Sequence, residues 1–342
     1  MIFLLNPQER TKLLMDKIKE LIQDISQARQ SNVICYIGGD RKNISTRVAP
    51  DIIPIFHKHL EAIKNNSKND KIDLLLYTKG GDVLTALRLV QLIYEYTDNF
   101  SVLIPYKSYS AGTLISLGAS EIIMTKMGEL SPVDPNVTSI FNPVDPNNSS
   151  AKIPISVEDV YSFITLVKDI MDIQSDDSLS SIFSKLVENV HPLALGSIHR
   201  TYLLIRSVAK KLLLSHMDIS EEVRINEIIN HLTEKLFSHN YMITRKEAKE
   251  FLKLPVNYCD SDLERDIWNI YEYYKDYLEL DKPFIPEKYV DINGRFSAGC
   301  GIIESIYRTD EYIFEGVIQR SSSYDGNIAD NVNITYQGWK MI

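Results

Sequence analysis

Residues 72–125 read IDLLLYTKGGDVLTALRLVQLIYEYTDNFSVLIPYKSYSAGTLISLGASEIIMT. Three short apolar runs in this stretch predict buried strands, because each is bounded by polar or turn residues. Between the first two runs, apolar residues recur at helical spacing over 83–96, and the small residues of 111–119 predict a second helix. Strands that alternate with helices are typical of an α/β sheet with right-handed crossovers and helices on both faces. The three runs are 72–77, 100–105 and 121–125.

The residues before this stretch extend the same pattern. A β-branched run over 32–37 ends in Gly38 and Gly39 and predicts another strand. Leucine and isoleucine recur at helical spacing over 7–29, which predicts an amphipathic helix. We expect this helix to pack on a core or on a partner subunit.

The residues after this stretch differ from it in composition. The stretch 131–152 is rich in proline, asparagine and serine and contains PVDPN twice, which predicts a loop near a site. The pattern over 156–237 is helical, and capping-box spacing predicts further helix starts at Thr244 and Ser261. Short alternating runs within 256–342 predict a small β-containing segment.

These patterns divide the chain into three parts. We predict an N-terminal amphipathic helix in 1–30, an α/β core in 31–255 and a C-terminal extension in 256–342. The second half of the core is expected to be helical, and the sequence does not indicate what the extension does.

Composition excludes several classes of protein. The chain has 37 Lys and Arg and 46 Asp and Glu residues, so its net charge of −9 has the wrong sign for a nucleic-acid-binding protein. Its three cysteines form no CxxC pair, which argues against disulfides and thiolate zinc sites and favours a reducing cytoplasm. Charged residues interrupt every apolar stretch before it reaches about 20 residues, so we expect no membrane span. No cofactor and no metal are expected.

Two turns of small residues are the candidates for chemistry. The turn TKGGD (78–82) follows one predicted strand, and SYSAG (108–112) joins another strand to a helix. Ligands of open α/β sheets bind at the carboxyl ends of strands. A glycine pair can turn its amides outward, and a serine at a helix start lies in the positive end of the dipole, so the two turns could hold an oxyanion. Ser110 would then be the nucleophile; taken singly, each feature is also an ordinary turn or helix cap.

Four blocks of the chain resemble the ClpP/crotonase superfamily, and more closely its serine dehydrogenase proteinase branch, whose relatives include signal peptide peptidase A. The resemblance covers about 31–255 and implies a ClpP/crotonase-like α/β core of repeated β-β-α units. The blocks are YTKGGDVLTALRLV (77–90), PYKSYSAGTLISLGASEIIMTKMGELSPVDP (105–135), HPLALGSIHRTYLLIR (191–206) and HLTEKLFSHNYMITRKEAKEFL (231–252).

The resemblance implies a serine nucleophile and an oxyanion hole. The Ser-Ala-Gly turn places the nucleophile at Ser110. The amides of Gly81, with Gly80 beside it, and of Ala111 would form the oxyanion hole.

A serine hydroxyl needs a base that takes its proton. ClpP has its histidine shortly after the serine, whereas this chain has none between 60 and 190. The resemblance to the serine dehydrogenase proteinase branch implies a Ser, Asp, His order instead, which assigns Asp134 and His191. This order is possible because a triad is defined by geometry and not by chain order. Asp145 in the second PVDPN is the competing carboxylate, and His199 is the reserve base.

Three alternatives stay open. Signal peptide peptidase A resembles this chain but uses a Ser-Lys dyad, and Lys152 would be the lysine here, although its polar loop argues against the desolvation that such a base needs. A crotonase-type acyl-CoA enzyme would use the same oxyanion hole for an enolate. The third alternative is a catalytically inactive scaffold.

We therefore expect a cytoplasmic, ATP-independent serine endopeptidase that acts on peptides or proteins. Its extended substrate should lie beside Gly80 and Gly81. The family implies a homo-oligomer, and we expect no nucleic-acid partner.

Overall fold

The computed structural model describes residues 7–133, 136–137, 140–145, 147–234, 238, 241–322 and 328–342. The chain forms two units. One, here called the sheet unit, comprises Met1–Leu130 and Ile243–Ile342, and the other, the helical unit, comprises Ser131–Met242.

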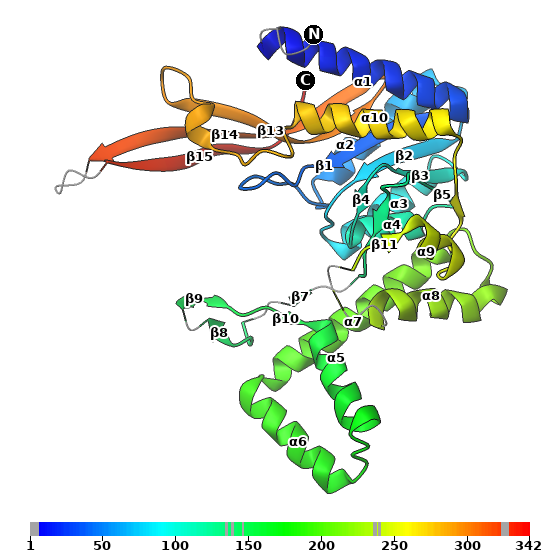
Figure 1. Cartoon of the computed structure of the whole chain (residues 1–342), viewed down its shortest axis with the longest axis vertical. Helices are drawn as coiled ribbons and strands as arrows, with labels where there is room; N and C mark the ends of the chain where they lie inside the picture. The colour runs from blue at the N-terminus through cyan, green and yellow to red at the C-terminus, as the bar shows by residue number, and fades with distance from the viewer. Residues whose placement is uncertain are drawn as a thin grey trace. The chain divides into compact units, whose positions relative to one another are not determined.

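An eight-stranded mixed sheet is the centre of the sheet unit. The strands β12, β5, β3, β2 and β1 run parallel, and β13, β14 and β15 continue the sheet in antiparallel order beyond β1 (Figure 1). All four apolar runs expected to be strands are confirmed as strands of this sheet. The strands are β1 (Asn32–Gly38), β2 (Ile72–Tyr77), β3 (Phe100–Ile104), β5 (Glu121–Met124), β12 (Val256–Asn257), β13 (Arg295–Ser305), β14 (Arg308–Ser322) and β15 (Ile328–Met341).

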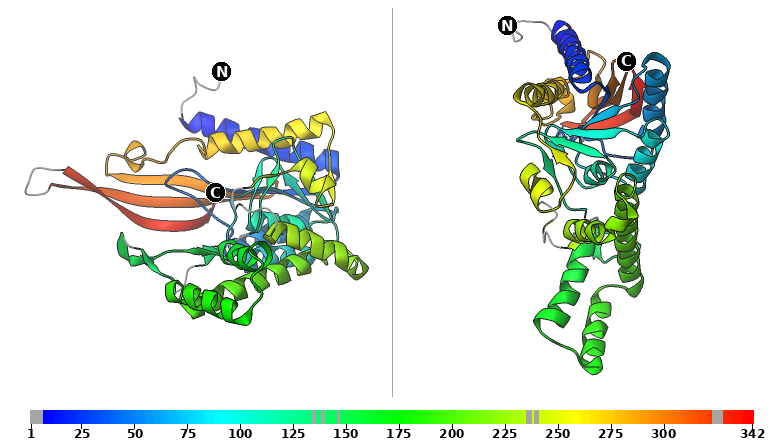
Figure 2. Two further views of the ribbon diagram at one scale, coloured as in Figure 1. Left: turned by 60° about the horizontal axis from the view of Figure 1, so that its bottom comes forward. Right: turned by 90° about the vertical axis from the view of Figure 1, so that its right-hand side faces the viewer.

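Helices cover both faces of this sheet, as predicted. On one face, α1 and α10 lie side by side (Figures 1 and 2). Helix α1 points Ile18, Ile22 and Ile25 into the core at helical spacing, and all three are fully buried. On the other face, Phe56 of α2 contacts Tyr36 of β1 edge to face, with the ring centroids 5.7 Å apart. The helices are α1 (Pro7–Arg29), α2 (Ile52–Asn66), α3 (Val83–Tyr94), α4 (Ala111–Leu117), α9 (Arg245–Glu250), α10 (Ser261–Tyr277) and the short 3₁₀ helix Pro286–Lys288.

Two predicted helix starts can be checked directly. Thr244 is the N-cap of α9, since its hydroxyl accepts the N–H of Glu247. Helix α10 begins at Ser261, but its N-cap is Asp260, whose carboxylate accepts two amide protons of the first turn. The expected cap was therefore wrong by one residue, because aspartate caps at least as well as serine.

A small three-stranded sheet leads into the serine turn. Its order is β11 (Ile243–Thr244), β6 (Glu129–Leu130) and β4 (Lys107–Ser108). Because β4 directly precedes Ser110, this sheet fixes the path of the chain into α4.

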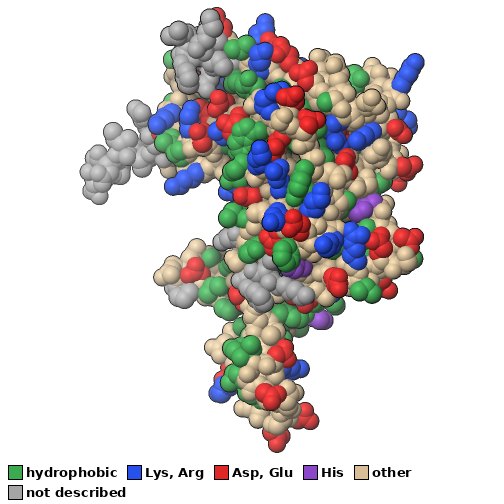
Figure 3. Space-filling view, turned by 45° about the vertical axis from the view of Figure 1, so that its right-hand side comes forward, with side chains coloured by type: hydrophobic (Ala, Val, Ile, Leu, Met, Phe, Trp, Pro, Cys, Tyr) green, Lys and Arg blue, Asp and Glu red, His purple; other side chains and the backbone are tan. Residues whose placement is uncertain are grey.

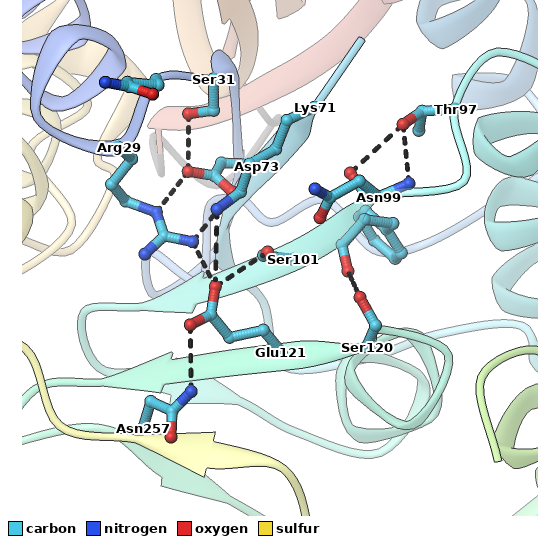
Figure 4. A network of polar contacts seen from close by, with 12 residues as sticks. Arg29, Ser31, Lys71, Asp73, Thr97, Asn99, Ser101, Ser120, Glu121 and Asn257 are labelled. Carbon is cyan, nitrogen blue, oxygen red and sulfur yellow. Dashed lines mark hydrogen bonds and ion pairs between the residues drawn. The ribbon is translucent and has the colours of Figure 1, made fainter.

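A polar network joins strands and a helix at the amino ends of the parallel strands (Figure 4). The guanidinium of Arg29, at the end of α1, pairs with the buried carboxylate of Asp73 on β2 and with Glu121 on β5. The side-chain amide of Asn257 on β12 donates to Glu121 over 3.0 Å. Partial burial acts to raise the pKa of Glu121, but the hydrogen bonds from Arg29 and Asn257 and the charges of Arg29 and Lys71 outweigh it and lower this pKa to about 2.

The segment 256–342 adds to the sheet of the core. Strand β13 pairs with β1 from Ile34 opposite Ser305 to Gly38 opposite Gly301. The alternating runs that were expected in this segment lie in β14 and β15. The predicted division of the chain at residue 255 stays a prediction.

The helical unit contains the long helices that were predicted for 156–237, within its described residues. In place of the expected loop, the stretch 131–152 contains short strands, of which β8 pairs with β9 and β7 with β10. The elements are β7 (Asn136–Val137), β8 (Val144–Asp145), β9 (Asn148–Lys152), β10 (Ile155–Ser156), α5 (Val157–Thr165) with a π-helical turn at Leu166–Ile170, α6 (Asp176–Asn189), α7 (Pro192–Leu213), the 3₁₀ helix Ile219–Glu221 and α8 (Glu222–Glu234).

Charged side chains of both signs alternate over the face of the molecule drawn in Figure 3.

Candidate active site

Ser110 lies in a strained turn between β4 and α4. It is the N-cap residue of α4 and has φ 52° and ψ −108°. A non-glycine residue in such a conformation costs about 1–3 kcal/mol and persists where its surroundings impose it. Serine nucleophiles on other folds occupy sharp strand-to-helix turns of this kind, because the turn presents the hydroxyl. Ser110 is half-buried.

The glycine pair lies against this turn. A Cβ atom on Gly80 would lie 2.7 Å from the Cβ of Ser110, 2.8 Å from the carbonyl oxygen of Tyr109 and 3.2 Å from the amide nitrogen of Ala111. Gly80 has φ +107°, which side chains rarely adopt. Only glycine therefore permits this approach of two backbone segments.

Hydrogen bonds to Val48 orient the glycine pair. The carbonyl oxygen of Gly80 accepts the N–H of Val48 over 2.9 Å, and the N–H of Asp82 donates to the oxygen of Val48 over 2.8 Å. Val48 and Gly81 thus form a parallel bridge. In such a bridge the enclosed residue turns its own N–H and C=O to the other side, so the amide of Gly81 points away from Val48.

A second amide lies beside the hydroxyl. Ala111 is the first residue of α4, and the first amides of a helix have no intrahelical acceptor. The structure therefore brings together Ser110, Gly80, Gly81 and Ala111, four of the predicted site residues, all within the sheet unit.

Thr78 ties the two turns to each other. Its N–H donates to the carbonyl of Lys107 over 2.9 Å, and its own carbonyl accepts the N–H of Tyr109 over 3.0 Å. Its hydroxyl accepts the N–H of Gly80 over 3.0 Å. The first two bonds fix the end of β2 against the chain that leads to Ser110, and the third holds the glycine turn itself.

His191, the predicted base, belongs to the helical unit. It is the N-cap residue of α7: its Nδ1 accepts the N–H of Leu193 over 3.1 Å, and its exposed ring stacks on Phe141 with the centroids 4.9 Å apart. A ring nitrogen that accepts a hydrogen bond carries no proton, so the neutral imidazole holds its proton on Nε2 in this arrangement.

The other base and carboxylate candidates also lie in the helical unit. The Nδ1 of His199 is 2.6 Å from the hydroxyl of Tyr161. Asp145 accepts the N–H of Asn147 over 2.8 Å, as a turn residue does, and Lys152 is half-buried at the end of β9. Asp134 lies outside the described residues.

The sequence reasoning missed an ionic cluster next to the glycine pair. The Oδ2 atom of Asp40 lies 3.2 Å from the Nζ of Lys79 and 3.4 Å from the Nζ of Lys107, and its Oδ1 accepts the hydroxyl of Tyr77 over 2.8 Å. Burial, together with the charge of Asp40, raises the pKa of Tyr77, which therefore stays a donor. The only signal in the sequence is that these charged residues follow predicted strands.

In the part of the chain that the structure describes, no group of three or more His, Cys, Asp or Glu side chains is placed to hold a metal ion. A search of the helices in the described ranges finds none that is both long enough and apolar enough to cross a membrane.

Comparison with known proteins identifies related chains. The model of the family of ClpP-like SDH-type serine proteinases matches residues 1–178. The uncharacterized protein MJ0137 of Methanocaldococcus jannaschii is 25% identical over 280 residues, which are 79% of this chain and 82% of that protein. The uncharacterized protein MJ1495 of the same organism is 32% identical over 146 residues, which are 40% of this chain and 48% of that protein.

Among solved structures, this chain is similar to a mutant of the 1510-N membrane-bound stomatin-specific protease in complex with a substrate peptide. The sequence identity is 15%, the match covers 68% of this chain and 78% of that one, and the TM-score is 0.37. A second mutant of the same protease gives the same identity and TM-score and is covered to 82%.

Proposed function

Since the chain belongs to the family of ClpP-like SDH-type serine proteinases and is therefore a serine peptidase, we propose that it cleaves its substrates through an acyl-enzyme on Ser110. The observation that carries this proposal is the contact of Gly80 with the strained Ser110 turn. In the proposed arrangement, the main-chain amides of Gly81 and Ala111 face the hydroxyl of Ser110.

The chemistry follows from this arrangement. The Oγ atom of Ser110 attacks the carbonyl carbon of the scissile bond while a base removes its proton, and negative charge develops on the carbonyl oxygen. The amides of Gly81 and Ala111 would donate to this oxygen; one such donor contributes about 100- to 1000-fold to turnover in other serine hydrolases. The leaving amine takes the proton from the base, and water then hydrolyses the ester on Ser110.

His191 is the proposed base, with Asp134 as the carboxylate that orients it. His191 would then have to release the N–H of Leu193 and carry its proton on Nδ1, so that Nε2 is free to accept the proton of Ser110. A carboxylate that accepts the Nδ1 proton stabilises this tautomer. His199, Asp145 and Lys152 are the alternatives within the same proposal, with Lys152 giving a Ser-Lys dyad.

Labelling with a fluorophosphonate tests the nucleophile. We expect the wild-type chain to be labelled and Ser110→Ala to be unlabelled. Ser120→Ala is the matched control, because Ser120 is an exposed serine of the same unit, at the far end of α4, whose hydroxyl donates to the carbonyl of Phe100. An unlabelled wild-type chain would contradict the proposal and favour the inactive scaffold or the acyl-CoA enzyme.

Two substitutions distinguish the bases. His191→Asn keeps an N-cap for α7 but removes the base, so we expect labelling to slow by at least about a thousandfold. Lys152→Ala is expected to leave the rate nearly unchanged. The reverse pattern would replace the triad by the Ser-Lys dyad.

Peptides or proteins are the proposed substrates, extended along the free side of Gly81. We also propose that the chain forms a homo-oligomer in the cytoplasm. Sedimentation velocity of the full chain measures the oligomeric state; a monomer at all concentrations would contradict the proposed homo-oligomer.

A further inference from the structure

One carboxylate holds two lysines next to the glycine pair. The Oδ2 atom of Asp40 contacts both ammonium groups, those of Lys79 and Lys107, and Oδ1 is occupied by the hydroxyl of Tyr77. The carboxylate side chain is 9% exposed, whereas the side chain of Lys79 is 58% exposed. Asp40 therefore fixes the position of Lys79 without enclosing it.

The backbone positions of both lysines are close to the proposed nucleophile. Lys79 directly precedes Gly80, whose Cα would carry a side-chain carbon 2.7 Å from the Cβ of Ser110. Lys107 precedes Ser108 on β4, and its carbonyl accepts the N–H of Thr78. One lysine therefore lies in the glycine turn that follows β2, and the other lies in the segment that leads to Ser110.

Two further carboxylates next to the turns accept hydrogen bonds from neighbouring side chains and amides. Asp82 accepts the N–H and the hydroxyl of Thr85 over 2.7 and 2.6 Å, as the N-cap of α3. Glu129 accepts the hydroxyl of Tyr109. An ammonium group has three N–H donors, and Lys79 shares a single oxygen of Asp40 with a second lysine, so it keeps donors for a ligand.

We propose that Lys79 is a specificity-determining residue that selects substrates with an acidic side chain within about two residues of the scissile bond. Adjacent residues of an extended peptide are about 3.3 Å apart, so such a carboxylate comes within reach of a side chain that starts one residue from Gly80. Asp40 holds Lys79 beside Lys107, which contributes a second positive charge next to the glycine pair. This inference rests on the proposed function, because it presumes that Ser110 is the reacting residue.

Paired peptides test this inference on the full chain. The probe is a pair of fluorogenic peptides that differ only by Glu or Gln next to the scissile bond, and the measured quantity is the ratio of their kcat/KM values. We expect wild type to favour the Glu peptide by about two- to fivefold, the range of a partly exposed ion pair, and we expect added salt to reduce this preference.

Three variants complete the test. Lys79→Met should bring the ratio to one, Lys79→Glu should invert it, and Lys79→Arg should keep it. Lys246→Met is the matched control, since Lys246 is an exposed lysine of the same unit on α9, and it should keep the wild-type ratio.

The failures are distinguishable. If wild type is labelled at Ser110 and cleaves both peptides with equal kcat/KM, or if Lys79→Met keeps the preference, the specificity role of Lys79 is wrong while the proposed function stands. If wild type shows neither labelling nor cleavage, the proposed function itself is wrong.

Discussion

Gly80 and Ser110 depend on each other's backbone conformation. Ser110 adopts a positive φ, and Gly80 fills the space beside it where any side chain would collide with backbone atoms. The motif of a glycine pair followed by a serine turn was predictable from residue types. The positive φ of Ser110 was not predictable, because serine rarely adopts it and the segments packed around the turn, among them Thr78, are distant in sequence.

Substitution of Gly80 by alanine tests this dependence. The new Cβ would push the Ser110 turn away from the oxyanion amides, so we expect fluorophosphonate labelling to slow by about 100-fold, the contribution of one misplaced donor. Gly196→Ala is the control: no atom lies within 4 Å of the added Cβ, and alanine should stabilise α7 by about 0.5–1 kcal/mol. Labelling of Gly80→Ala at the wild-type rate would show that the contact does not position the hydroxyl.

The ionic cluster at Asp40 could not be predicted from its residues alone. Each of its members follows a predicted strand, but the strands are distant in sequence, and their order in the sheet determines which charged residues meet. Lys79 and Lys107 converge on Asp40 because β1, β2 and β3 are neighbours.

At the scale of elements, the Arg29 network connects α1 to three strands of the sheet. Arg29 is 8% exposed at its side chain and bonds to β2 and β5, and Asn257 brings in β12. Loss of the charge on Glu121 would remove one of the two carboxylate partners of the buried Arg29 guanidinium and leave Asp73 as the other, which weakens the network.

Acid should therefore weaken the sheet unit in a defined range. The pKa of Glu121 is lowered from 4.5 to about 2 in the folded chain, so its contribution to stability is complete above about pH 4.5 and is lost as the pH falls toward 2. We expect the free energy of unfolding to fall by about 2–3 kcal/mol from this group over that range. Chemical denaturation at several pH values measures the fall.

Glu121→Gln should remove this part of the pH dependence. Glu20→Gln is its control, because Glu20 belongs to an exposed ion pair with Lys17. Equal acid sensitivity of wild type and Glu121→Gln would contradict the role of the network.

Prediction of elements succeeded where the pattern was clear. Each predicted strand of the parallel part is a short run of mostly apolar residues, and the spacing of Ile18, Ile22 and Ile25 identified α1. The two-residue strands β4, β6 and β11 leave no period in the sequence, yet they fix the chain before Ser110.

At the scale of the whole chain, the sheet unit is built from segments far apart in sequence. Strand β13 occupies the place next to β1, and its residues follow β1 by more than two hundred positions. No local pattern indicates this pairing, because hydrophobic alternation specifies which face of a strand is buried but not which strand lies beside it.

Coverage of both faces of the sheet also determines which thiols can react. Cys35 on β1 and Cys300 on β13 are fully buried, whereas Cys259 is partly exposed. Burial raises the pKa of both buried thiols, so neither forms the reactive thiolate. Partial burial and the charge of Glu264 also raise the pKa of Cys259, so we expect a thiol reagent to modify Cys259 first in the native chain, more slowly than an unfolded cysteine, and all three thiols after denaturation. Modification of Cys35 or Cys300 in the native chain at the rate of Cys259 would mean that the sheet is less covered than described.

The bridge between Val48 and Gly81 gives the connection between β1 and α2 a role that its composition does not suggest. That connection contributes no proposed nucleophile and no proposed base, but its length determines which residue lies opposite Gly81 in the bridge. An insertion or deletion there would move Val48 and with it the Gly81 amide that we propose for the oxyanion hole. Under that proposal, such a change lowers turnover without replacing any residue that touches the substrate.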